Sequence, residues 1–158
     1  MPILDADERK RLAEVVKELK GCDFTKLKYG FVHGDIIPTN ILRHNLGKLF
    51  FIDFSVSNYL PRIVDLAVVI GDLCIDLNDI ETSKKRTDTF LKTYQRVDKL
   101  SDYEKSCLRI FLKAHQATSI LYHLRENKIE GNCSEENKFY INNSRKALDV
   151  VSKVNFIK

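Results

Sequence analysis

The chain has 158 residues, of which 44% are hydrophobic and 30% are charged, with six glycines and three prolines. This composition is typical of a globular domain and excludes disordered and fibrous classes. The net charge of +4 is small and spread along the chain, which favours solvated helix faces over a nucleic-acid surface. No apolar run approaches the ~18 residues of a membrane span, so we expect neither a nucleic-acid nor a membrane partner.

The first predicted element is a helix near the start of the chain. Asp5 and Glu8 have the spacing of a capping box, and Gly21 is typical of the residue that ends a helix. Between them, apolar residues recur at the i, i+3, i+4 and i+7 positions of one helix face. These residues are Leu12, Val15, Val16 and Leu19.

Three short β-prone runs follow, at residues 29–32, 41–43 and 49–54. The link between the second and third runs contains Asn45 and Gly47, which favours a β-hairpin. Pro38 and Pro61 cannot continue a helix and mark loops.

From Ile63 onward the apolar pattern is helical. It predicts a buried helix over about 66–77, a second over 81–97, a long helix that opens with a capping box at Ser101 and Glu104, and a last helix after Gly131. We therefore predict a mainly α fold (class α+β), with about five helices around a small β-hairpin element. Residues 1–158 are expected to form a single domain, with a catalytic loop at 31–54 and a helical subdomain at 63–158.

The residues that indicate chemistry are Asp35, Asn40 and Asp53, in the patterns His-Gly-Asp, Asn five residues later, and Asp-Phe at the end of an apolar run. If the hairpin forms, these three oxygen-bearing side chains converge on one pocket. Phosphoryl transfer needs such a set, with one carboxylate for the attacking hydroxyl and further oxygens that hold Mg²⁺ on nucleotide phosphates. Each residue alone could simply cap a turn, so the prediction depends on their conjunction.

The conjunction resembles the motif of the aminoglycoside phosphotransferase and choline kinase superfamily, H-G-D-x-x-x-x-N followed by I-D-F. A second match, P-x-x-x-D-L-A, lies at residues 61–67, and the resemblance covers residues 29 to about 76. Gly34 stands where eukaryotic protein kinases usually have Arg, which points to the small-molecule branch. The resemblance implies the C-terminal lobe of a protein-kinase-like fold.

The resemblance also implies roles for five residues. Asp35 would be the catalytic base or the carboxylate that orients the hydroxyl, and Asn40 and Asp53 would be the ligands of Mg²⁺ on ATP. His33 would be a structural member of the same loop packed under Asp53, with direct catalysis as the alternative role. Asp65 would support the loop through hydrogen bonds to its backbone, or cap a helix, and both readings stay open.

One departure from the family pattern concerns the loop interior, where Ile36, Ile37 and Thr39 replace the usual glycine or polar residues. The apolar pair could narrow or redirect the substrate pocket.

A complete kinase of this type also has an N-terminal lobe, with a β-sheet and a phosphate-covering loop. The chain has no G-x-G-x-x-G, and only about thirty residues precede His33. We therefore expect a C-lobe alone, either a piece of a longer kinase or a shortened protein, that is inactive without an N-lobe in cis. The uncovered surface around Ile36, Ile37 and Phe51 would favour a homodimer.

The acceptor implied by the resemblance is a small hydroxyl-bearing molecule, such as an amino alcohol, an aminoglycoside or homoserine. Residues 65–67 and 72–74 resemble the homoserine kinase-like branch. Candidate acceptor contacts lie in the helical region and include two acidic residues that would suit a cationic amine. They are Asp72, Asp76, His115, Gln116, Tyr122 and His123.

The alternative to an enzyme is a non-catalytic interaction domain derived from the kinase fold. Retention of Asp35, Asn40 and Asp53 together argues against it, because a binding-only domain has no physical need for all three. The four cysteines, which form no C-x-x-C pair, are expected to be reduced thiols. Reduced thiols favour a cytoplasmic location.

Overall fold

The computed structural model describes residues 4–154, and its first element is the helix α1 (Ala6–Lys20). The Asp5 carboxylate caps this helix by accepting a hydrogen bond from the Glu8 amide at 2.8 Å. Leu12 and Val15 are buried, whereas Val16 is 50% exposed, so the buried stripe is narrower than the sequence pattern predicts. A short 3₁₀ turn, Phe24–Lys26, leads from α1 toward the first strand.

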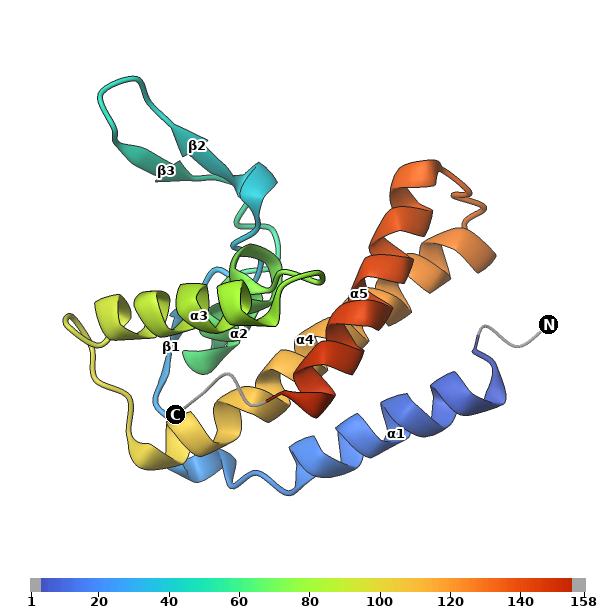
Figure 1. The fold of residues 1–158 in the computed structure, drawn as a ribbon, viewed down its shortest axis with the longest axis horizontal. Coiled ribbons are helices and arrows are strands. Elements are labelled where there is room, and N and C mark those ends of the chain that lie inside the picture. The colour runs from blue at the N-terminus through green and yellow to red at the C-terminus, as the bar shows by residue number, and fades with distance from the viewer. Residues whose placement is uncertain (1–3, 155–158) are drawn as a thin grey trace.

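The strands form two separate antiparallel ribbons. In one, β2 (Ile41–Arg43) pairs with β3 (Leu49–Phe51), which confirms the predicted hairpin, and a 3₁₀ turn at Pro38–Asn40 precedes it. Figure 1 shows that this hairpin projects away from the helices. In the other ribbon, β1 (Tyr29–Val32) pairs with β4 (Asn58–Pro61), a strand that the sequence pattern does not predict.

The predicted strand at 49–54 is too long, because β3 ends at Phe51. Two residues later Asp53 has a φ of 62°, and a strand cannot continue through that left-handed backbone. Asp53 therefore lies in a loop beyond the strand and not at its end.

The helical part contains four further helices, and two predicted boundaries change. The buried helix ends as a π turn at Cys74, earlier than predicted, because the Asp76 carboxylate accepts hydrogen bonds from the amides of Asn78 and Asp79 and forms a turn. Residues 95–97 leave the predicted 81–97 helix as a turn. The bounds are α2 (Ile63–Val69) with the π turn Ile70–Cys74, α3 (Ile80–Tyr94), α4 (Asp102–Lys128) and α5 (Glu135–Lys153).

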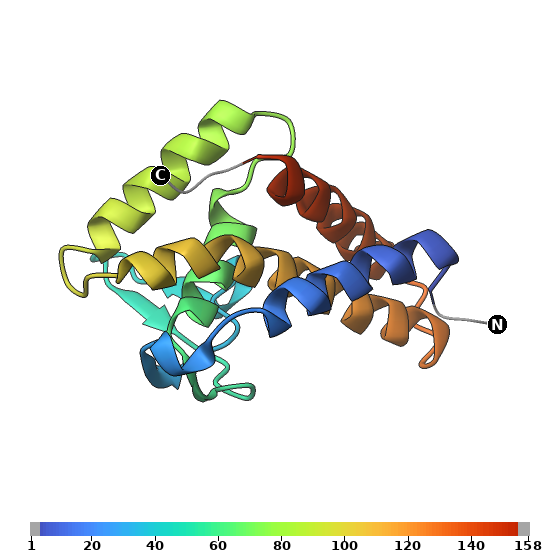
Figure 2. The same cartoon turned by 90° about the horizontal axis from the view of Figure 1, so that it is seen from below.

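The hydrophobic core is organised around α4, which contacts α1, α2, the π turn and α5. Figure 2 shows α4 running through the middle of the molecule, with α1 along one side and α5 along another. Leu108 and Ile120 of α4 are at most 1% exposed, and burial of such side chains stabilises the fold by about 1.5–3 kcal/mol each. The mainly α fold is confirmed, and within residues 4–154 no helix is long and apolar enough to cross a membrane.

The π turn and α4 meet at Gly71, where two side chains of α4 lie directly against the glycine. A Cβ atom at Gly71 would lie 2.7 Å from Gln116 Nε2 and 2.7 Å from His115 Cδ2. Both neighbours are held in a packed helix interface, so neither can give way freely.

We therefore expect Gly71→Ala to lower the free energy of unfolding by about 1–3 kcal/mol through overpacking. Urea denaturation followed by circular dichroism measures this change. Gly30→Ala is the matched control, because a Cβ there meets nothing within 4 Å. Equal stability of the two variants would contradict the expected steric conflict.

The cysteines are free thiols, and Cys74 and Cys107 are buried. The fold also places the Cys22 thiol close to Cys107, although the two are far apart in sequence. Burial, together with the neighbouring Cys107, raises the pKa of Cys22 to about 11. The Cys22 thiol therefore stays protonated at neutral pH.

Candidate active site

The catalytic-loop segment is held from below by Asp65, in the first turn of α2. Its Oδ2 accepts a hydrogen bond from the His33 amide at 2.9 Å, and its Oδ1 accepts one from the Gly34 amide at 2.7 Å. These are backbone hydrogen bonds of the kind that the resemblance implies. The N-cap of α2 is Arg62, so the reading of Asp65 as the helix cap is wrong.

His33 connects the loop to the segment that precedes Asp53. Its side chain is buried, and its Nδ1 accepts a hydrogen bond from the Asp35 amide at 3.3 Å. Since Nδ1 is an acceptor, we assign the proton to Nε2, which lies 3.0 Å from the Ile52 carbonyl oxygen and donates to it. The ring also packs on Phe54, with centroids 4.4 Å apart. The neutral ring thus has a structural position, with both nitrogens engaged.

The residue after His33 must be glycine for two reasons. Gly34 has a φ of 82°, in the left-handed region that disfavours side chains. A Cβ atom there would also lie 3.2 Å from the Val56 carbonyl oxygen. The His-Gly-Asp sequence therefore reflects backbone geometry as well as chemistry.

Asn40 is buried and oriented by Asp35. Its Nδ2 donates to the Asp35 backbone oxygen at 3.0 Å and to the Asp35 Oδ2 at 2.8 Å. Because the amide nitrogen is committed to these two acceptors, the side-chain oxygen of Asn40 is the atom left to bind a cation. The Asn40 backbone oxygen accepts a hydrogen bond from the Ile52 amide at 3.0 Å. This bond places Asp53, the next residue along the chain, close to Asn40.

Asp53 is exposed and fixed by a local turn. Its Oδ1 accepts hydrogen bonds from the Ser55 amide at 3.2 Å and the Ser55 hydroxyl at 2.6 Å. These bonds to Ser55 lower the pKa of Asp53. The side chain is therefore a carboxylate at neutral pH, and its Oδ2 remains for a ligand.

The donor set of this loop fits a hard cation such as Mg²⁺. Among residues 4–154, no three His, Cys, Asp or Glu side chains gather as a metal site. Asn40 and Asp53 instead offer one amide oxygen and one carboxylate, and Mg²⁺ on a nucleotide typically takes one or two protein carboxylates, waters and phosphate oxygens. The residues present therefore suit a metal that is shared with phosphates.

The candidate acceptor residues do not form one cluster. Asp72, on the π turn, lies 2.7 Å from His115 of α4, measured from Oδ2 to Nε2. Asp76 is instead engaged in the turn before α3. Tyr122 is 55% exposed, and its ring lies against His123, with centroids 5.1 Å apart.

Two other candidates face the interior of the helical region. Gln116 is buried, and within the described residues its Nε2 has no hydrogen-bond partner. His123 Nδ1 lies 2.7 Å from Asn137 Oδ1. Of the six candidates, Asp72 and His115 are the pair that the fold joins from distant parts of the sequence.

The apolar loop residue Ile36 lines a cavity of about 490 Å³ next to the loop. Side chains of α2, the π turn and α3, including Val69, Leu73 and Phe90, form its other walls. Ile36 therefore faces a largely apolar environment, which explains why an apolar side chain occupies this position of the loop.

Sequence reasoning misses two residues beneath the loop, Arg62 and Glu104, which form a buried ion pair. The capping-box pattern accounts for Glu104 by itself, and Arg62 falls on an unspecified position of P-x-x-x-D-L-A. The sequence feature that could identify Arg62 is its charge next to the apolar residues that begin the buried helix.

A family model of the "Phosphotransferase enzyme family" matches residues 2–107. The chain belongs to the phosphotransferase enzyme family. Among curated members, a homoserine kinase of Cupriavidus necator is 30% identical over 125 residues, covering 72% of this chain and 37% of that protein. A homoserine kinase of Polaromonas naphthalenivorans is 28% identical over 91 residues, covering 58% of this chain and 29% of that protein. The chain thus spans little more than a third of the curated relatives it matches.

Solved kinase structures share the fold. Amicoumacin kinase hAmiN, in complex with AMP-PNP, Ca²⁺ and Ami, superposes with a TM-score of 0.69 and 20% identity, covering 98% of this chain and 47% of that one. Plasmodium vivax ethanolamine kinase superposes with a TM-score of 0.65 and 19% identity, covering 94% and 40%. The predicted C-terminal-lobe fold of a small-molecule kinase is confirmed.

Proposed function

We propose that this chain carries the base and the metal ligands for ATP- and Mg²⁺-dependent phosphoryl transfer to a hydroxyl group of a small molecule. The supporting observation is the commitment of the Asn40 amide nitrogen to Asp35, which leaves the Asn40 oxygen free beside Asp53. Bound Mg²⁺ would neutralise charge on the phosphates.

In this proposal, the residues of the loop have distinct tasks. The Asp35 carboxylate orients the acceptor hydroxyl and accepts its proton. Asn40 and Asp53 hold the metal with their side-chain oxygens. His33 and Asp65 keep the loop in shape, His33 through the Asp35 amide and the Ile52 carbonyl, and Asp65 through two backbone amides.

The proposed acceptor is an amino alcohol, an aminoglycoside or a homoserine-like molecule. Curated relatives are homoserine kinases, and a structural neighbour is an ethanolamine kinase. An ammonium group on the acceptor would suit Asp72, whose side chain is 33% exposed and lies against His115. Asp76 and Tyr122 remain weaker proposals for acceptor contacts, because they lie apart from this pair.

We further propose that the activity needs an N-lobe in cis. The curated relatives are more than twice as long as their matched segments, and the β structure within residues 4–154 is limited to two ribbons of two strands. Residues 4–154 therefore offer no larger sheet that could enclose a nucleotide. A turnover assay with ATP, Mg²⁺ and a panel of amino alcohols should show negligible phosphate transfer by residues 1–158.

We also propose a cytoplasmic location. The support is that Cys22, Cys74, Cys107 and Cys133 are free thiols, and free thiols persist in reducing compartments. A fluorescent fusion of the full-length protein would show the compartment directly.

An alternative function is that of an interaction domain, favoured by a large exposed apolar surface on the strand region. Ile36 and Ile37 are only half exposed, so the surface is centred on the hairpin and not on the loop as expected. It comprises Phe31, Leu42, Leu46, Leu49, Phe50, Phe51, Ile52, Phe54, Val56 and Tyr59, each at least 40% exposed. Patches of this kind mark binding surfaces.

If no other lobe covers this surface, we expect the chain to form homodimers at micromolar concentration. Sedimentation equilibrium measures the association. Leu46→Lys and Leu49→Glu, which place charges on the 78% and 57% exposed positions, should weaken it at least tenfold. If the wild-type chain stays monomeric at concentrations 100-fold above the micromolar range, this expectation is contradicted.

Mg²⁺-nucleotide binding separates the two functions. Millimolar ATP with Mg²⁺ should stabilise the wild-type chain by about 1 kcal/mol, a shift in melting temperature of a few degrees. Asp53→Ala should abolish the Mg²⁺-dependent part of this shift. Differential scanning fluorimetry with and without Mg²⁺ gives the measurement.

Asp23→Ala is a closely matched control, because Asp23 Oδ1 accepts from Thr25 N at 3.1 Å and Thr25 Oγ1 at 2.6 Å, as Asp53 does from Ser55. It should keep the full Mg²⁺-dependent shift. If the wild-type chain shows no Mg²⁺-dependent shift in melting temperature, the interaction domain is favoured. If both Asp53→Ala and Asp23→Ala lose the shift, the shift does not come from a metal bound at Asp53.

A further inference from the structure

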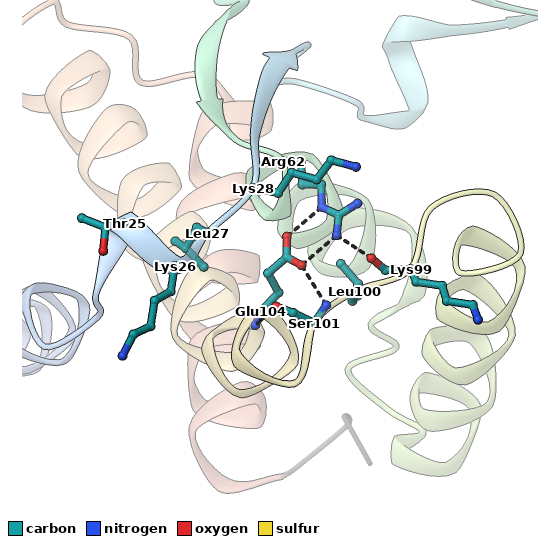
Figure 3. A pocket seen from close by; sticks show the side chains of 9 residues that line it. All are labelled: Thr25, Lys26, Leu27, Lys28, Arg62, Lys99, Leu100, Ser101 and Glu104. Carbon is teal, nitrogen blue, oxygen red and sulfur yellow. Dashed lines mark hydrogen bonds and ion pairs between the residues drawn. The ribbon is translucent and has the colours of Figure 1, made fainter.

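The ion pair beneath the catalytic loop is unusually complete. Arg62 Nε donates to Glu104 Oε1 at 2.7 Å, and Arg62 Nη2 donates to Glu104 Oε2 and to the Lys99 carbonyl oxygen, each at 2.7 Å. The third guanidinium nitrogen pairs with Asp98, and Glu104 also accepts from the Ser101 amide at 2.9 Å. Figure 3 shows the guanidinium facing the Glu104 carboxylate as a two-pronged pair.

This pair is buried, with side chains of Arg62 and Glu104 only 10% and 3% exposed. Burial of two charges has a desolvation penalty that can exceed their attraction, so a buried pair is weak grounds for expecting stability. The better supported role of a buried ion pair is to favour one arrangement of the packed elements over alternative arrangements. The planar guanidinium with two parallel hydrogen bonds is well suited to that, because it fixes orientation as well as distance.

The geometry that the pair fixes is that of the start of α2. Arg62 is the N-cap of α2, and its own amide donates to the Lys28 carbonyl oxygen at 2.9 Å, just before β1. Asp65 follows three residues later and accepts the amides of His33 and Gly34. The chain from Arg62 to Asp65 is one helical turn, so a tilt of the helix start moves the Asp65 carboxylate.

The surrounding cavity of about 480 Å³ has four cationic residues among its lining residues, which would suggest an anion site. Figure 3 shows that the amino groups of Lys26 and Lys99 point away from Arg62 and do not converge with it. Lys28 is engaged with Asp98 at 2.9 Å. The cationic group that faces inward, Arg62, is already paired with Glu104 and Asp98 and donates to the Lys99 carbonyl oxygen, so the cavity is better explained as space around a structural pair.

We infer that Arg62 and Glu104 are positioning residues: by fixing the first turn of α2 against the start of α4, they aim the Asp65 carboxylate at the backbone amides of His33 and Gly34 and so set the shape of the catalytic loop. The importance of this shape for phosphoryl transfer rests on the proposed function, whereas the mechanical link does not. Neither residue touches the proposed metal or acceptor positions.

The test is residue-resolved amide hydrogen exchange on the 158-residue chain. Glu104→Gln keeps the size of the side chain and removes its charge. It should speed exchange at the His33 and Gly34 amides at least tenfold beyond the acceleration of core amides such as Leu108. Equal acceleration everywhere, or none at the two loop amides, would overturn the inference.

A second two-pronged ion pair, with a buried glutamate and a half-buried arginine, provides the control. Arg145 donates to Glu8 at 2.7 and 3.1 Å and joins α5 to α1, away from the loop. Glu8→Gln should accelerate core amides without a selective effect on the two loop amides. If Glu8→Gln exposes His33 and Gly34 as much as Glu104→Gln does, the effect is general loosening and the inference fails.

A double-mutant cycle shows whether the effect passes through Asp65. In an Asp65→Asn background, Glu104→Gln should change exchange at Gly34 less than twofold, because the acceptor it positions is already altered. A full tenfold effect in that background would contradict the link. If Glu104→Gln does not fold, Arg62→Lys, which keeps the charge but loses the two-pronged geometry, takes its place with the same expected pattern.

Nucleotide binding distinguishes this inference from the proposed function. If Mg²⁺-ATP binds, Glu104→Gln should weaken it at least threefold while Glu8→Gln leaves it unchanged, and equal affinity in wild type and Glu104→Gln would contradict the functional part. If Mg²⁺-ATP does not bind the wild-type chain, the interaction domain is favoured over the proposed function, and selective exchange at the loop amides still decides the mechanical link.

Discussion

Replacement of Asp65 by alanine is expected to lower the free energy of unfolding by about 2–4 kcal/mol. The reason is that the amides of His33 and Gly34 lose a charged acceptor at 2.9 and 2.7 Å, and hydrogen bonds to charged groups contribute about 1.5–3 kcal/mol each. Water can reach these partly buried amides and recover some of the loss. Urea unfolding followed by circular dichroism measures the change.

Asp65→Asn is expected to fall between wild type and Asp65→Ala, because the amide side chain keeps one acceptor oxygen for the two backbone donors. Asp149→Ala serves as the surface control. Its ion pair with Arg11 is exposed, and such pairs contribute at most about 1 kcal/mol. A stability of Asp65→Ala within 0.5 kcal/mol of wild type, roughly the range of surface substitutions, would contradict a supporting role for Asp65.

The parts of the fold that the sequence predicts are those with local signals. The capping box of α4 forms as expected, with Ser101 and Glu104 hydrogen-bonded in both directions. The hairpin forms because its turn residues and apolar runs are neighbours in sequence. The motif from His33 to Asp53 is likewise local, so the spacing of its oxygen-bearing residues could be interpreted without a structure.

The parts that the sequence does not predict depend on distant partners. β4 contains Asn58 and Pro61, which are unfavourable in strands, and it is stabilised by β1, almost thirty residues earlier. The proximity of Cys22, which follows α1, to Cys107 of α4 arises from packing of α1 on α4. The left-handed backbone of Asp53 is a conformation that is uncommon for residues other than glycine.

The candidate site shows the same division. Asn40 and Asp53 are predicted from their motif, but the geometry that frees the Asn40 oxygen requires the observed bonds from Asn40 to Asp35. For the acceptor, the sequence offers acidic and aromatic residues over a span of some fifty positions. The fold joins Asp72 with His115 and separates them from Asp76 and Tyr122, because helix packing, and not sequence proximity, decides which side chains meet.

Acid is expected to weaken the fold through Glu104. Burial alone would raise the pKa of Glu104, but hydrogen bonds from Arg62 and Ser101 outweigh it and bring the pKa down to about 2. In the unfolded chain the pKa of a glutamate is about 4.3. The folded state therefore gains on the order of 3 kcal/mol from the ionised Glu104, present in full above about pH 5 and lost as the pH falls toward 2.

Glu104→Gln isolates this contribution, because other carboxylates titrate alike in both proteins. The difference in unfolding free energy between wild type and Glu104→Gln should be largest at pH 7, shrink by about 1 kcal/mol by pH 3.5, and narrow further toward pH 2. Urea unfolding at a series of pH values measures it. A difference that stays constant from pH 7 to 3.5 would mean that Glu104 has no lowered pKa in the folded chain. The ion pair with Arg62 would then be too weak to hold the start of α2, and with it Asp65, in place.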